Sequence, residues 1–420
     1  MGAESFGITD LDALEILDSR GNPTLRVSVE LSTGQRASAG VPSGASTGSR
    51  EAVELRDGDA DRYGGKGVTR AVSNVNGELA ELLRSRTWSA LAEVDRAMND
   101  ADGTGNKARL GANAIIGVSM ALARALAGTN ELYTYLRLGG TSPRLPVPHF
   151  NVLNGGAHAP NSLDFQEFMI APIGAPSLPE AVRAGATVYG RLRSLLQDRG
   201  FATGLGDEGG FAPDITRPED VLALLVEAIE GAGYTAGRAG VAIALDPAAS
   251  EFYDDGSYRV AGESLTSTEM IERYAQMVAD FPVWSIEDGL AEGDWDGWVA
   301  LTERLAGRAQ IMGDDIFVTN PAIITEAIGR KLGSSALIKL NQIGSVSETL
   351  EAMRLCRDAG YTQMVSHRSG ETEDSFIADL TVGTGCGQLK SGAPARGERV
   401  AKYNRLLQIA ATTDLPYGLA

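Results

Sequence analysis

Six charged or imidazole side chains stand at the ends of short apolar runs in the second half of the chain. They are Asp246, Glu287, Asp314, Lys339, His367 and Lys390. The runs that carry them are "VAIALD", "VWSIED", "AQIMGDD", "SALIKL", "TQMVSH" and "GQLK". Polar residues often end strands because solvent begins there. Six reactive groups in succession, with no Ser, Thr or Asn among them, instead indicate a shared site.

The three carboxylates of this set predict a site for a hard cation. Asp246, Glu287 and Asp314 are oxygen ligands with no cysteine or histidine among them. Few oxygen ligands, which leave places for water and substrate, favour Mg²⁺ over Ca²⁺. A solvated acidic rim is the alternative, but carboxylates held close together repel one another unless a cation lies between them.

The two lysines of the set are candidates for a general base. A lysine near a dication and a second lysine has its charged form disfavoured, so we expect a lowered pKa. The alternative is that each lysine pairs with a carboxylate, which fits Lys390 better than Lys339 in its apolar setting "ALIKLNQ". An elimination also needs an acid opposite the base. Glu167 in "DFQEFMIAP" and Glu208 in the glycine-rich "GLGDEGGFAP" are the candidates.

A barrel is the scaffold that would bring these side chains together. Strand-like runs alternate with helical stretches such as 320–332 and 345–360, which predicts parallel βα units. About eight such units close a barrel, and the carboxyl ends of its strands meet at one mouth. We therefore expect an α/β protein with a (β/α)8-type catalytic barrel over residues 136–420. Strand signals followed by helical periodicity predict a smaller α+β capping domain over residues 1–135.

The composition of the chain excludes several classes of protein. A net charge of -18 over 420 residues argues against a nucleic-acid partner, whose phosphates attract an excess of Lys and Arg. Only Cys356 and Cys386 occur, which argues against a disulfide scaffold or a thiolate zinc site and fits a reducing cytosol. The N-terminus lacks the pattern of a signal peptide, and no run reaches the roughly 18 apolar residues of a membrane span. We expect a cytoplasmic protein with no membrane contact.

Longer motifs of the chain resemble those of the enolase family, the phosphopyruvate hydratases. In chain order they are "DSRGNPT", "PSGASTG", "ELRDGD", "LGANAIIGVS", "NVLNGGAH", "QEFMIAP", "GDEGGFAP", "ALDPAASEFY", "SIEDGLAE", "GDDIFVTNP" and the stretch from "ALIKLNQIGS" to "GERVAKYN". The resemblance covers nearly the whole chain. It implies an enolase-like barrel and a glycolytic hydro-lyase that reversibly dehydrates 2-phosphoglycerate to phosphoenolpyruvate through an enolate stabilised by Mg²⁺.

The resemblance also implies roles for residues at matching positions. Asp246, Glu287 and Asp314 would hold one Mg²⁺. Ser46 would help to hold a second Mg²⁺, which binds with the substrate, so that each active site takes two. A homodimer or a higher homo-oligomer is also implied.

For the reaction itself, Lys339 would be the base that takes the C2 proton. Glu208 would be the acid that assists loss of the C3 hydroxyl, with Glu167 beside it. Arg368 and Ser369 would hold the phosphoryl group of this small anionic substrate. The other residues that would line the substrate pocket are His158, Gln166, His367 and Lys390.

Some departures from the family pattern keep a related enzyme as an alternative. His149 and Phe150 replace the usual methionines, Pro160 replaces a polar residue, and the tail "ATTDLPYGLA" is short. A carboxyphosphonoenolpyruvate synthase-type homologue of phosphonate biosynthesis would perform the same elimination on a substrate with a larger phosphorus group. A non-catalytic structural protein with an enolase fold is a further alternative, but such a protein would be expected to lose Lys339, Glu208 or a metal carboxylate, and none is lost.

Overall fold

An antiparallel sheet with helices on one side forms the first unit of the computed structural model, which describes residues 5–44 and 48–420. The strand order is β3-β2-β1-β4. These strands are β1 (Phe6–Leu17), β2 (Pro23–Leu31), β3 (Arg36–Gly40) and β4 (Thr87–Trp88). The helices are α1 (Thr69–Asn74), α2 (Ala80–Arg84), α3 (Leu91–Asp102), α4 (Ala112–Ala127) and α5 (Leu132–Tyr135). Apolar residues alternate along β2 and bury one face of the sheet against α4.

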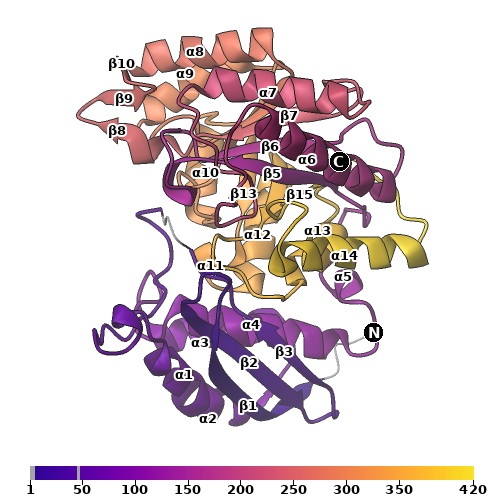
Figure 1. Cartoon of the computed structure of the whole chain (residues 1–420). Coiled ribbons are helices and arrows are strands. Elements are labelled where there is room, and N and C mark those ends of the chain that lie inside the picture. The colour runs from indigo at the N-terminus through magenta and orange to yellow at the C-terminus, as the bar shows by residue number, and fades with distance from the viewer. Residues whose placement is uncertain (1–4, 45–47) are drawn as a thin grey trace.

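Eight strands close into a barrel in the second unit (Figure 1). Around the barrel they are β11 (Val283–Glu287), β12 (Gln310–Gly313), β13 (Ser335–Ile338), β14 (Thr362–Ser366), β15 (Gln388–Lys390), β5 (Val147–Asn154), β6 (Glu167–Ala171) and β7 (Ala242–Asp246). The predicted barrel and the smaller preceding unit are thus confirmed.

One strand of the barrel runs against the others, which the expectation of parallel units did not include. β6 is antiparallel to both β5 and β7, whereas the other neighbouring pairs are parallel. Segment 155–166, which joins β5 to β6, contains no crossover helix, and a parallel connection needs such a crossover. As a result, the first residue of β6, Glu167, pairs with the last residue of β7, Asp246. A residue at a strand start therefore joins the mouth formed by strand ends.

Helices surround the barrel and follow most of its strands. They are α6 (Leu178–Asp198), α7 (Pro218–Gly231), α8 (Ser267–Asp280), α9 (Trp295–Leu305), α10 (Pro321–Gly329), α11 (Leu340–Ile343), α12 (Val346–Asp358), α13 (Phe376–Thr384) and α14 (Gly397–Thr412). A small sheet of β8 (Tyr253–Asp254), β9 (Ser257–Val260) and β10 (Glu263–Leu265) projects beside α8 (Figure 1). Within the described residues, no helix is both long and apolar enough to cross a membrane.

The short C-terminal tail packs against the barrel strands at the end opposite to the mouth. The backbone N–H of Leu145 donates to Pro416 O at 2.9 Å, and the Tyr417 hydroxyl donates to Pro172 O at 2.9 Å. Tyr417 and Leu419 pack against apolar side chains of several barrel strands, among them Trp284. The C-terminal tail therefore lies away from the strand ends that carry the reactive groups.

Candidate active site

A narrow pocket at the mouth of the barrel gathers most of the side chains that the sequence indicated. Its lining residues are His158, Gln166, Glu167, Glu208, Lys339, Ser366, His367, Arg368, Ser369 and Lys390. Barrel strands and the loops next to them supply most of these side chains, whereas Glu208 comes from the segment between α6 and α7. Convergence of groups from positions 158 to 390 is what a closed barrel with a common mouth produces. Ser46, the remaining predicted metal ligand beside the three acids, lies outside the described residues.

Lys390 is surrounded by three buried carboxyl groups. Its Nζ lies 2.7 Å from Glu287 Oε1, 3.2 Å from Asp246 Oδ2 and 3.3 Å from Glu167 Oε1. Burial disfavours the ammonium form, but the three carboxylates outweigh burial and raise the pKa of Lys390 well above its usual value. Lys390 is therefore a permanent cation, and the pairing alternative that the sequence left open describes its geometry.

Lys339 forms an ion pair with Asp314. Burial opposes the charged amine, yet Asp314 raises the pKa of Lys339 above its usual value. Our expectation of a lowered pKa is therefore wrong for this structure, because it counted the repelling cations and omitted the adjacent carboxylate. Gln342 holds the second oxygen of the same carboxylate, with Nε2 2.8 Å from Asp314 Oδ1.

Glu208 lies at the centre of a buried hydrogen-bonded group. Asn151 Nδ2 donates to Glu208 Oε2 at 2.8 Å, and His367 Nε2 lies 3.2 Å from the same oxygen. Arg399 Nη1 lies 2.6 Å from His367 Nδ1 and must donate to it, which leaves the proton of a neutral imidazole on Nε2. Burial lowers the pKa of His367 to about 3, so the ring is neutral. Burial also works against an ionised Glu208, but the hydrogen bond from neutral His367 and the charge of Arg399 favour the carboxylate and hold the pKa of Glu208 below its usual value.

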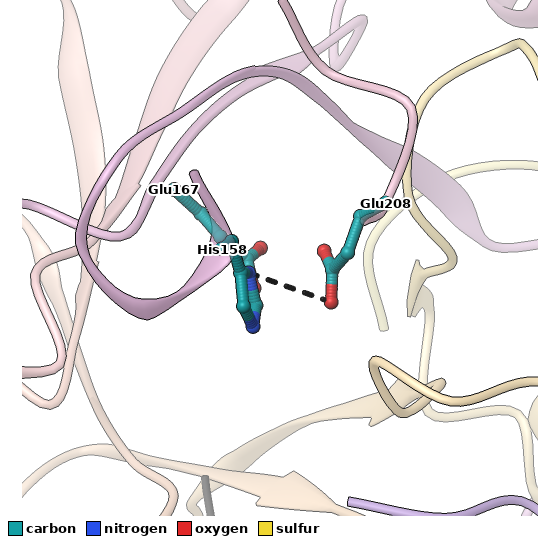
Figure 2. Close-up of side chains that lie close together, drawn as sticks. All are labelled: His158, Glu167 and Glu208. Carbon is teal, nitrogen blue, oxygen red and sulfur yellow. Dashed lines mark ion pairs between the residues drawn. The ribbon is translucent and has the colours of Figure 1, made fainter. Parts of the chain in front are cut away.

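Glu167 forms the second half of an unequal carboxyl pair. His158 Nδ1 lies 3.7 Å from Glu167 Oε1 and 3.7 Å from Glu208 Oε1, and Glu208 faces the other two side chains across the pocket (Figure 2). Burial and then the charge of Glu208 raise the pKa of Glu167 well above its usual value. One carboxyl group is thus favoured as the acid and the other as the anion, which is the division of protons that acid–base chemistry uses.

Arg368 and Ser369 lie at the side of the pocket that faces the N-terminal unit. Arg368 Nη1 and Nη2 lie 2.9 Å and 3.0 Å from the two carboxylate oxygens of Glu51, and Nη1 also donates to Asn341 Oδ1 at 3.0 Å. Arg20 Nη1 approaches Ser369 Oγ at 3.4 Å. Two guanidinium groups, Arg368 paired with Glu51 and Arg20 paired with Asp207, thus lie beside Ser369 in what we call the cationic corner. Guanidinium groups are suited to binding a phosphoryl group.

Sequence reasoning missed several residues that complete this site. They are Glu51, Asn151, Gln342 and Arg399. Asn151, Gln342 and Arg399 occur within motifs already quoted for the family, and Glu51 lies between two of those motifs. None of the four ends a strand-like run, which is the pattern that indicated the other site residues. Their partners lie far away in the chain, so local patterning could not reveal them.

The donor set Asp246, Glu287 and Asp314 suits a divalent cation by its chemistry, although among the described residues it is carboxylate oxygens of Asp288, Asp314 and Asp315 that lie within 4.8 Å of one another. All three members of the donor set are buried, and within the described residues no group donates a hydrogen bond to Glu287 Oε2. Burial and then the charge of Asp246 raise the pKa of Glu287 well above its usual value. A hard cation would relieve both the unsatisfied oxygen and the repulsion.

Buried carboxylates for a cation, a lysine and an acidic pair in one barrel mouth define a metal-dependent lyase. Comparison with known proteins specifies its family. Residues 8–138 match the family model "Enolase, N-terminal domain", and residues 142–414 match "Enolase, C-terminal TIM barrel domain". An enolase from Rubrobacter xylanophilus is 57% identical over 398 residues, which cover 94% of this chain and 92% of that protein.

The chain belongs to the enolase family. Its activity is that of a lyase, phosphopyruvate hydratase, with a divalent metal cofactor. Nothing in these comparisons favours the carboxyphosphonoenolpyruvate synthase-type alternative.

Proposed function

We propose that Lys339 takes the C2 proton of 2-phosphoglycerate while the Glu167–Glu208 pair protonates the departing C3 hydroxyl. The C2–H electron pair forms the new double bond, the C3–O bond breaks, and water and phosphoenolpyruvate leave. The observation that carries this proposal is that Lys339 and Glu208, from separate parts of the chain, line the same narrow pocket. A base and an acid on one substrate are the minimum that this elimination requires.

We propose that Asp246, Glu287 and Asp314 hold one Mg²⁺ and that Ser46 contributes to a second. When bound, Mg²⁺ stabilises the negative charge that develops on the substrate as the C2 proton leaves. Asp314 would then share its charge with a cation, which weakens the ion pair that raises the pKa of Lys339. The amine would thereby move towards the neutral form that a base needs.

The acid in this proposal is a pair of carboxyl groups. The raised pKa of Glu167 and the lowered pKa of Glu208 support one shared proton, held on Glu167 before the reaction. His158 Nδ1 lies 3.7 Å from both carboxyl groups. The His158 ring carries no charge, because burial lowers its pKa. Loss of either carboxyl group would remove the acid.

The cationic corner at Arg368 would bind the phosphoryl group. Arg368 keeps its charge because Glu51 raises its pKa against the effect of burial. Ser369 would donate a hydroxyl hydrogen bond beside it. Gln166, His158, His367 and Lys390 would line the remainder of the pocket, where neutral imidazoles and the fixed ammonium orient the substrate carboxylate and hydroxyl groups.

We further propose a cytoplasmic, glycolytic enzyme that assembles as a homodimer or a higher homo-oligomer. The side chains of Leu14 and Leu17 on β1 are 47% and 56% exposed. Apolar side chains left exposed on the N-terminal sheet are consistent with burial against a second copy. Sedimentation equilibrium of the purified protein tests this assembly.

A paired substrate assay tests the proposed reaction. Purified protein is given Mg²⁺ and either 2-phosphoglycerate or its carboxyphosphono analogue, and formation of the enolpyruvate product is followed in the ultraviolet. We expect efficient turnover of 2-phosphoglycerate. Negligible turnover of this substrate together with rapid turnover of the analogue would overturn the proposal.

A further inference from the structure

Asp288 directly follows Glu287 at the end of β11, and nothing so far gives it a role. Its side chain is buried, with the residue 5% exposed. Its backbone adopts a φ of 41°, in the left-handed region that most side chains avoid and that aspartate tolerates better than most. A buried carboxylate on such a backbone must have a structural or a chemical reason to be there.

The side chain of Asp288 holds the loop that carries Asp314. Asp288 Oδ1 accepts a hydrogen bond from the backbone N–H of Asp314 at 2.8 Å. Asp288 Oδ2 accepts one from the backbone N–H of Asp315 at 2.9 Å. Both carboxylate oxygens are therefore engaged by consecutive backbone donors at the end of β12.

The backbone of Asp288 connects the same point to two further segments. Its N–H donates to Met312 O at 3.0 Å, and its carbonyl accepts from Ala249 N at 3.0 Å. Ala249 belongs to the loop after Asp246, where the backbone N–H of Ala248 also donates to Asp246 Oδ1 at 3.0 Å. A single residue thus links the loops that carry Asp246, Glu287 and Asp314.

A direct metal ligand is the alternative role for this side chain. Carboxylate oxygens of Asp288, Asp314 and Asp315 lie within 4.8 Å of one another, close enough to share a cation. Both oxygens of Asp288, however, already accept backbone hydrogen bonds. For Asp315 it is the backbone N–H, and not the carboxylate, that makes the contact with Asp288. This pattern fits a side chain that orients ligands better than one that binds the ion.

We propose that Asp288 is a positioning residue that holds three carboxylate-bearing loops in the arrangement that binds a divalent cation. The inference rests on the proposed metal set of Asp246, Glu287 and Asp314. Groups that orient metal ligands from behind commonly change metal affinity by about 10- to 100-fold when they are replaced. An asparagine at position 288 would keep the size of the side chain but would present an amide donor to one of the two backbone N–H groups.

The test is a calorimetric titration of Mg²⁺ into the metal-free, full-length protein without substrate. We expect Asp288→Asn to weaken Mg²⁺ binding by about 10- to 100-fold. Asp294→Asn is the matched control, since Asp294 accepts from Gly297 N, Tyr258 Oη and Ser267 Oγ at the start of α9, away from the site. We expect this control to keep the wild-type Mg²⁺ affinity.

If Asp288→Asn does not fold, Asp288→Glu replaces it. We then expect the Mg²⁺ affinity to weaken several-fold, because the carboxylate is displaced by one methylene.

Two further variants separate the possible results. Asp315→Asn should bind Mg²⁺ nearly as wild type does, and weakening equal to that of Asp288→Asn would assign both carboxylates to the ion and overturn the positioning role. Unchanged affinity in Asp288→Asn, or equal weakening in Asp294→Asn, would also overturn it. Glu287→Gln tests the proposed metal set itself, and Mg²⁺ binding that survives this change contradicts that set. If Glu287→Gln loses Mg²⁺ binding but Asp288→Asn keeps the wild-type affinity, only the positioning role of Asp288 is contradicted.

Discussion

Glu51 of the N-terminal unit and Arg368 of the barrel form a buried, bidentate ion pair. Arg368 Nη1 lies 2.9 Å from Glu51 Oε2, and Arg368 Nη2 lies 3.0 Å from Glu51 Oε1. The two residues are 317 positions apart in the chain. Glu51 also accepts from Gln342 Nε2 at 3.3 Å, and Gln342 in turn holds Asp314. The Glu51 carboxylate therefore contacts the proposed phosphoryl-binding residue Arg368 directly, and it is linked to Asp314 through the Gln342 side chain.

Replacing Glu51 with alanine should destabilise the protein strongly. Arg368 would keep its charge in a buried place after losing its bidentate partner, and removal of one member of such a pair costs about 3–5 kcal/mol. We expect the free energy of unfolding to fall by about this amount, or by somewhat less because Arg368 keeps its hydrogen bond to Asn341. Urea unfolding measures it. Glu351→Ala, which breaks an exposed ion pair with Arg354, is the control, with an expected change below about 1 kcal/mol. Equal effects of the two substitutions would contradict the importance of burial.

Lys339→Ala should abolish turnover of 2-phosphoglycerate while the protein remains folded. Removal of a general base commonly lowers the rate by about 10²- to 10⁴-fold. Steady-state formation of phosphoenolpyruvate measures the effect, and circular dichroism monitors the fold. Lys331→Ala is the matched control, because Lys331 is exposed beyond α10. Turnover by Lys339→Ala within a few-fold of wild type would exclude this residue as the base.

Thorough chelation with EDTA should remove the activity, and added Mg²⁺ should restore it. The expected loss follows from the proposed metal set of Asp246, Glu287 and Asp314, since chelation would remove the cation that stabilises the charge developing on the substrate. The measurement is the rate of phosphoenolpyruvate formation before chelation, after chelation and after a titration with Mg²⁺. Undiminished activity in metal-free buffer would contradict the assignment of the carboxylates to a metal.

The stability of the protein should depend on pH through Asp95, far from the site. Asp95 on α3 accepts a hydrogen bond from Ser347 N at 3.0 Å, and burial raises its pKa to about 6 from an ordinary value of 3.8. Between these values the folded protein binds more protons here than the unfolded chain does. The contribution of Asp95 to stability therefore falls as the pH rises towards 6 and is constant above it.

The variant Asp95→Asn isolates this effect. Its unfolding free energy relative to wild type should rise by about 1 kcal/mol or more between about pH 5 and about pH 7.5. Urea unfolding at several pH values measures the difference. Asp100→Asn, an exposed position on the same helix, controls for removal of a charge. A difference from wild type that does not change with pH in Asp95→Asn would show that burial does not hold the proton on this group.

The sequence was sufficient to predict the barrel, its smaller partner unit and most of the pocket. Strand-length runs ending on Asp246, Glu287, Asp314, His367 and Lys390 are local features, and a barrel converts strand ends into one mouth whatever the loops do. Site residues at strand ends can be predicted because the sequence gives both their chemical type and their position along the strand. The same reasoning could not foresee that β6 runs antiparallel and that Glu167 joins the mouth from a strand start.

Tertiary structure alone decided which groups face one another and therefore which protons they hold. Lys339 was expected to have a lowered pKa, but Asp314 lies against it and raises the pKa instead. Glu51 and Asp288 acquire their places in the site from contacts with Arg368 and with the Asp314 loop. The physical reason is that side-chain periodicity is a local property, whereas a pKa or an ion pair sums the charges and burial that distant segments bring to one point.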